Sequence, residues 1–108
     1  MAYDEVLADR VRDRLSDAVG VTERRMFGGV AFLTDGNLTV GVRGEELVVR
    51  LSPDEGEEAL ARPGVRPFDL SGRPMHGWVL VAADHLDDPD LYRWLAEATA
   101  YVASLPPR

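Results

Sequence analysis

The sequence predicts an α+β domain over residues 1–108, in which helices cover one face of a mostly antiparallel sheet. Apolar residues recur at helical spacing near both ends of the chain, which predicts an amphipathic helix in each place. Between them, runs rich in β-branched and aromatic residues alternate with short turns that contain glycine. These runs lack a regular strand–helix–strand repeat, which favours antiparallel pairing. The expected order is helix, three strands, short helix, two strands, helix.

The first helix is expected over residues 4–19. Asp4 is suited to cap its N-terminus, and Gly20 follows the last apolar position, where helices commonly end. Four apolar residues are spaced so that they share one side of the helix, which we expect to face the core. These residues are Leu7, Val11, Leu15 and Ala18.

The strand-rich part of the chain begins directly after this helix. Residues 23–27 could form a short strand that ends at Gly28 and Gly29. Three β-rich runs follow, and the turns between them contain glycine, so we expect an antiparallel meander. The runs are residues 30–33, 38–43 and 47–51, and the turns are residues 34–37 and 44–46.

A second, short helix is expected after residue 52. Ser52 can cap it, Pro53 suits the first helical position, and Glu55 completes a capping box. Proline and glycine within residues 62–64 end this helix. Residues 65–70 and 75–81 are then two further strands. They are joined by a turn at residues 71–74, and Pro67 favours an edge position for the first of them.

The last helix is expected to begin near Asp87 or Asp88, with Pro89 at its first position, and to end before the two prolines at 106–107. Its apolar residues again recur at helical spacing, which predicts a buried side. These residues are Leu91, Leu95, Ala98 and Val102.

The net charge of the chain excludes some classes of binding partner. The formal net charge is −7, the isoelectric point is near 4.7, and every basic residue is an arginine. Binding of duplex DNA and of anionic membranes depends on a basic surface, so we expect no direct nucleic-acid binding and no membrane association. Complementary charge instead predicts a protein partner with a basic face. The N-terminus lacks the pattern of a signal peptide, which predicts a cytoplasmic protein.

Sequence motifs for catalysis are missing. The chain has no cysteine, which removes disulfides and thiolate chemistry. No phosphate-binding loop, dinucleotide fingerprint or nucleophile elbow occurs. His76 and His85 are the two imidazoles, and the aspartates around His85 are explained by capping of the last helix. We therefore expect no enzyme, no cofactor and no metal site.

Two short stretches combine arginine, methionine, glycine and an aromatic residue at the start of an expected strand. In one interpretation the apolar residues belong to the core and the glycines allow tight turns. In the other, Arg24 or Arg25 joins Arg73 to clamp an anion beside an apolar wall of Phe27, Met75 and Trp78. The candidate binding residues are Arg24, Arg25, Met26, Phe27, Gly28, Gly29, Arg73, Met75, His76 and Trp78.

Three segments together resemble the TfoX/Sxy N-terminal-domain family in its short, stand-alone form: residues 25–29, the turn at 35–37 and residues 73–78. This resemblance covers essentially the whole chain in order. It implies a two-layer α-β(3)-α-β(2)-α fold similar to secretion chaperones, the same order that the residues predict. It also implies a link to the regulation of natural competence, in which longer relatives with a second, C-terminal domain act as co-regulators of transcription.

Two functions are therefore expected from the sequence. The first is a non-enzymatic, cytoplasmic module that acts through protein contacts, as an accessory in transcription or competence regulation. The second is a protein that binds a small anion or metabolite with the loops at residues 24–29 and 73–78. A homodimer is also expected to be possible, through an exposed strand edge or through the last helix, where Trp94 and Tyr101 occupy a separate side.

Overall fold

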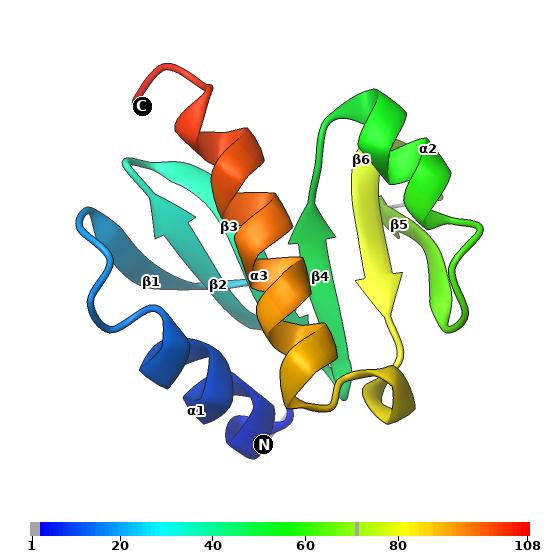
Figure 1. Cartoon of the computed structure of the whole chain (residues 1–108), viewed down its shortest axis with the longest axis horizontal. Coiled ribbons are helices and arrows are strands. Elements are labelled where there is room, and N and C mark those ends of the chain that lie inside the picture. Colours follow the sequence, from blue (N-terminus) through cyan, green and yellow to red (C-terminus); the bar gives the residue numbers. More distant parts are fainter. Residues whose placement is uncertain (1–2, 71) are drawn as a thin grey trace.

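The computed structural model describes residues 3–70 and 72–108, which form three α-helices, a short 3₁₀ helix and six strands (Figure 1). The helical elements are α1 (Glu5–Arg14), α2 (Pro53–Ala59), η1 (Ala83–His85) and α3 (Asp88–Ala103). The strands are β1 (Val21–Met26), β2 (Gly29–Thr34), β3 (Asn37–Arg43), β4 (Glu46–Arg50), β5 (Val65–Leu70) and β6 (Arg73–Val81).

All six strands form one antiparallel sheet in the order β1-β2-β3-β4-β6-β5. The α+β class is therefore confirmed, and Pro67 lies on an edge strand as expected. Four strands precede α2, where the expected order has three, because β1 pairs with β2 along its whole length. Phe27 and Gly28 close this hairpin with φ angles of 43° and 77°, the positive values that tight hairpin turns require.

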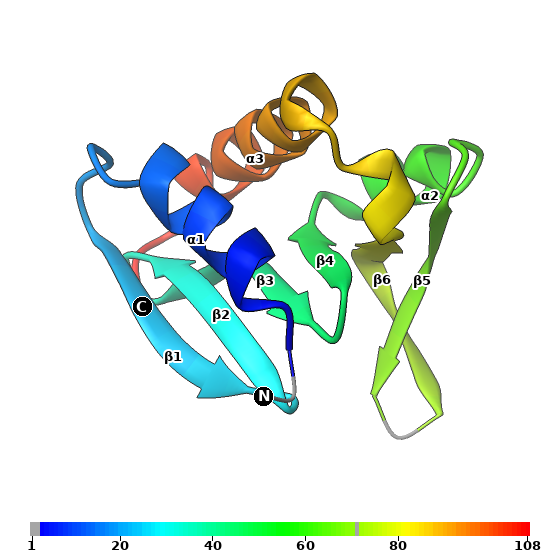
Figure 2. The same ribbon diagram turned by 90° about the horizontal axis from the view of Figure 1, so that it is seen from below.

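The three α-helices lie on the same face of the sheet (Figure 2). The main core lies between these two layers and includes Val11 of α1, Phe32 of β2 and Leu91 of α3. As predicted, Asp4 caps α1, since its side chain accepts from the backbone N–H groups of residues 6 and 7. No helix in the described ranges is both long and apolar enough to cross a membrane.

Helix α1 ends at Arg14, five positions before the predicted residue 19. The chain turns back there toward β1, and Gly20 takes a positive φ of 82° within this turn. Ala18, which the helical spacing places on the core side, is consequently exposed. The spacing of apolar residues predicts which side of a helix is buried, but it does not predict the residue at which the helix ends.

Helix α2 approaches strand β6 at backbone contact distance. A Cβ atom added to Gly56 would lie 2.5 Å from the Cα atom of Gly77, so only glycine fits between the two backbones. Gly77 itself has a φ of 89°. The predicted cap of α2 is also confirmed, because the Ser52 hydroxyl accepts from the Glu55 N–H at 3.1 Å. Likewise, Asp87 caps α3 by accepting from the N–H of Asp90.

Candidate functional site

The face of the sheet opposite the helices, called here the rear face, carries its own apolar cluster. Phe68 is fully buried at its centre, together with Val48 and Leu80. Phe27, Met75 and Trp78 are half-buried and pack around them. A neighbouring group consists of Ala31, Leu33 and Leu38, which also contacts Phe27 and Trp78. In Figure 2 this face is the lower side of the sheet, where no helix lies.

Three aromatic rings organise the rear face. The centroid of the Phe68 ring lies 5.7 Å from that of Phe27 in an edge-to-face contact. It lies 5.9 Å from that of Trp78 in a stacked contact. The Phe27 ring reaches this cluster across Gly41, whose missing side chain leaves room for it: a Cβ atom there would be 2.8 Å from the ring. The first and second predicted stretches thus meet through their apolar residues.

The neighbouring arginines of the first stretch point to opposite faces. Arg24 pairs across the hairpin with Ala31 of the rear cluster, whereas Arg25 pairs with Val30 of the main core. Side chains of directly paired residues share a face, so Arg24 lies on the rear face and Arg25 on the helical face. Of these two, only Arg24 shares a face with the aromatic cluster. Met26, two positions after Arg24, lies on the rear face as well.

In the second stretch, Arg73 and Met75 are two positions apart on β6, so their side chains lie on the same face of the strand. Met75 contacts the Phe68 cluster, which places Arg73 on the rear face too. His76 instead lines a cavity of about 180 Å³ together with Met75, Trp78 and residues of α2. This cavity has no arginine in its lining.

Two arginines that the sequence did not single out also belong to this region. The Arg43 guanidinium lies 5.5 Å from the centroid of the Phe68 ring. The Arg50 guanidinium lies 5.3 Å from the Trp78 ring and 5.9 Å from the Tyr101 ring of α3. Such distances allow cation–π attraction. Arg43 and Arg50 could be assigned to this region from the alternation of side chains along the strands, once the register of the sheet is known.

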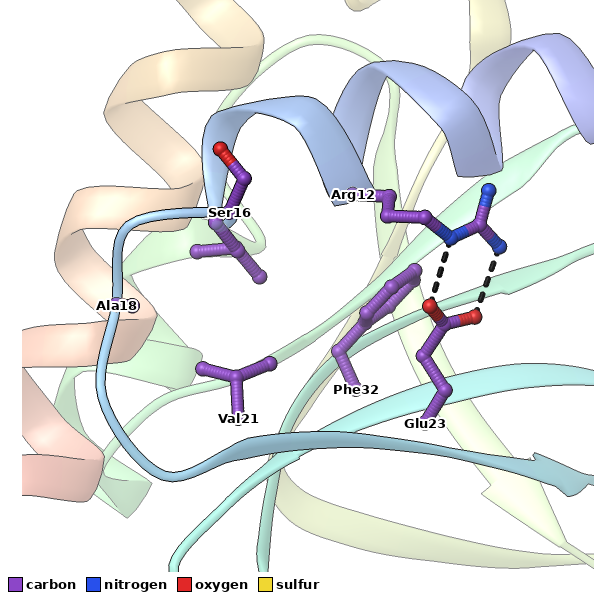
Figure 3. Close-up of a pocket in the computed structure, with 7 residues that line it drawn as sticks. Arg12, Ser16, Ala18, Val21, Glu23 and Phe32 are labelled. Carbon is purple, nitrogen blue, oxygen red and sulfur yellow. Dashed lines mark hydrogen bonds and ion pairs between the residues drawn. The ribbon is translucent and has the colours of Figure 1, made fainter.

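A second cavity lies between α1 and β1 on the helical side of the sheet (Figure 3). It has a volume of about 220 Å³, and its lining includes Leu15, Val21 and Phe32. Arg12 and Glu23 form a two-point ion pair beside it, with distances of 2.6 and 2.8 Å. The hydrogen bond from Arg12 lowers the pKa of the Glu23 carboxyl and raises the pKa of the guanidinium.

Replacing Glu23 with glutamine should remove an acid-sensitive part of the stability. Because the folded state lowers the pKa of Glu23, the ion pair stabilises the fold above the ordinary glutamate pKa of about 4.3 and is lost as the pH falls through the folded value. Both side chains are more than one third exposed, so the loss at neutral pH should stay below about 1 kcal/mol.

Urea denaturation at neutral and acidic pH, at low ionic strength, measures this difference. Glu57→Gln, on the exposed side of α2, is the matched control. A difference between wild type and Glu23→Gln that stays constant over the acidic range would contradict the assigned ion pair.

Within residues 3–70 and 72–108, no group of three or more histidine, aspartate or glutamate side chains is placed to hold a metal ion. Comparison with known families gives a match. The family model described as TfoX N-terminal domain matches residues 13–103, which include all six strands, α2 and α3. No curated protein and no solved structure matches the chain.

Proposed function

The chain belongs to the TfoX N-terminal domain family, and on this basis we propose that it is a non-enzymatic cytoplasmic module that acts through contacts with a protein partner. The process that it serves is the regulation of transcription or competence, as an accessory to a regulator. A module with a net charge of −7 can join a regulatory complex on DNA by binding the regulator and leaving the phosphates untouched.

The rear face is the observation that supports a protein contact most directly. It holds half-buried Phe27, Met75 and Trp78 beside Met26, which is 37% exposed. Aromatic residues, methionine and arginine are the side chains enriched in protein interfaces. The helices cover the other face and satisfy the main core there, so the rear cluster is not needed to hold them (Figure 2).

A small-anion site remains the second candidate. Arg24 and Arg73 share the rear face, which supports it. The strand order separates them, however, because β1 is one edge of the sheet and β6 is next to the other edge. The cavity lined by Met75, His76 and Trp78 also faces α2 and Glu57 instead of the arginines. A broad contact surface therefore fits this arrangement better than a two-arginine clamp.

Site-specific photo-crosslinking tests the proposed protein contact. A photoreactive amino acid is placed at position 26 on the rear face or, as a control, at exposed position 13 on α1, and each chain is irradiated in cells of the organism that encodes it. We expect position 26 to give one protein adduct of constant mass, and position 13 to give none.

Each other result has a defined meaning. An adduct from position 13 alone would still indicate a protein partner, but it would contradict the rear face as the contact site. If neither position gave an adduct, and an intact chain retained its fold by circular dichroism, the proposed protein-contact function would be rejected.

A further inference from the structure

Most carboxylates of this molecule lie on its helical side, whereas several arginines lie on its rear face. The helices and their caps carry most of the carboxylates, which give the helical layer its negative charge. They are Asp4, Glu5, Asp9, Asp13, Asp54, Glu55, Glu57, Glu58, Asp84, Asp87, Asp88, Asp90 and Glu97. Arginines of this layer are largely neutralised locally: Arg10 pairs with Asp88, and Arg62 makes a two-point ion pair with Glu97.

The rear face has the opposite sign. Arg24, Arg43 and Arg73 lie on it, and in the described part of the chain no carboxylate is within ion-pair distance of their guanidinium groups. Glu46 pairs with Arg43 across β3 and β4 and therefore shares the rear face, where it forms a two-point ion pair with Arg66. The net charge of −7 is therefore a property of the helical layer, and a partner that meets the rear face meets positive charge.

These arginines lie beside apolar side chains and can bind carboxylate groups of a ligand. The Arg43 guanidinium lies 5.5 Å from the centroid of the Phe68 ring. A guanidinium is a planar set of N–H donors that matches the two oxygens of a carboxylate. Between the arginines lie the half-buried apolar side chains of Phe27, Met75 and Trp78. A ligand complementary to this surface alternates acidic and apolar groups.

We propose that the rear face binds an acidic peptide segment of the protein partner, with aromatic or methionine side chains between its carboxylates. This inference rests on the proposed protein-contact function and names the chemistry of the contact. A nucleic acid fits less well, because it presents a continuous row of phosphates to a chain with a net charge of −7 and few free arginines. A second copy would place its acidic helices on this face in a head-to-tail contact that does not close into a dimer.

The two tryptophans allow a direct test in the intact chain. Trp78 lies on the rear face, and Trp94 is buried under α3 on the helical side. In ¹H–¹⁵N spectra, their indole N–H signals report on the two faces separately. A short peptide of alternating glutamate and phenylalanine should shift the Trp78 signal and leave the Trp94 signal in place. A peptide of alternating lysine and phenylalanine should shift neither signal.

A matched pair of variants tests the arginines. Arg24→Ala with Arg73→Ala should weaken binding of the glutamate–phenylalanine peptide about tenfold or more. Arg25→Ala with Arg93→Ala removes the same charge from the helical face and should leave the affinity unchanged. Equal loss of affinity in the two double variants would overturn the assignment, since it would show a response to overall charge alone.

Three further outcomes would also reject the inference. The first is a Trp78 shift with oligothymidylate at lower concentration than with the acidic peptide, which would favour nucleic acid. The second is a Trp78 shift that depends on protein concentration without any peptide, which would favour a second copy. The third is a crosslinked partner at position 26 while no acidic peptide binds, which leaves the protein-contact function standing and removes only the acidic chemistry.

Discussion

Gly29→Ala should lower the free energy of unfolding by about 3 kcal/mol or more. Gly29 begins β2 and pairs with Met26, the last residue of β1. A Cβ atom at position 29 would lie 1.9 Å from the carbonyl oxygen of Val42 and 3.2 Å from the Cα atom of Arg43. Both atoms belong to the backbone of β3, so no side-chain rotation relieves the overlap. The β2–β3 pairing must open locally to admit the methyl group.

Gly28→Ala is the control that distinguishes steric overlap of the added methyl group from the cost of a positive φ. No atom lies within 4 Å of a Cβ at position 28, but its φ is 77°. This substitution should cost only about 1 to 2 kcal/mol, the usual penalty for a left-handed alanine. Urea unfolding followed by far-ultraviolet circular dichroism measures both variants. A smaller loss for Gly29→Ala than for Gly28→Ala would show that the β2–β3 contact is looser than described.

Phe68→Ala should destabilise the protein by about 3 to 5 kcal/mol, since removal of a fully buried phenylalanine leaves a cavity. The Phe68 ring contacts those of Phe27 and Trp78 and lies under the Arg43 guanidinium. Loss of the Phe68 ring therefore removes the contact shared by residues 24–29 and 73–78. Such a cost is a large part of the total stability of a domain of this size.

Equilibrium urea unfolding gives the free-energy change for this variant, and the Trp78 indole signal gives the local effect. Phe68→Leu keeps most of the volume and should recover much of the loss. In Phe68→Ala, the Trp78 signal should broaden or move while the Trp94 signal of the helical side stays in place. A loss below about 1 kcal/mol would contradict the central position of Phe68 in the rear cluster.

Much of the fold could be predicted because its signals are local. The caps at Asp4, Ser52 and Asp87 are read from short-range hydrogen-bonding preferences, and all three are present. The edge position of Pro67 follows equally from the missing N–H of proline. For β1 the sequence predicts a short strand over residues 23–27 and not the observed Val21–Met26, since five of its six residues are exposed and show no apolar alternation. Its place in the sheet depends on pairing with β2, which periodicity in the sequence does not reveal.

The rear face could be predicted only in part. The sequence predicts an apolar wall of Phe27, Met75 and Trp78, and in the structure these three side chains contact the same cluster. The sequence leaves open whether Arg24 or Arg25 shares a face with Arg73, because that depends on the register of the strands. The pairing shifts between Phe32 and Leu33 and again between Pro67 and Asp69, and each shift changes which side chains share a face.

The strand order has a consequence for the kinetics of folding. Every pairing except that of β4 with β6 joins strands that are consecutive in the chain, so most of the sheet assembles from hairpins with small loops. The β4–β6 pairing encloses α2 and β5, and its formation carries the largest closure entropy among the strand pairs. We therefore expect β1–β4 and the β5–β6 hairpin to form early. The pairing of β4 with β6, which also brings Gly56 of α2 against Gly77 of β6, should then limit the folding rate.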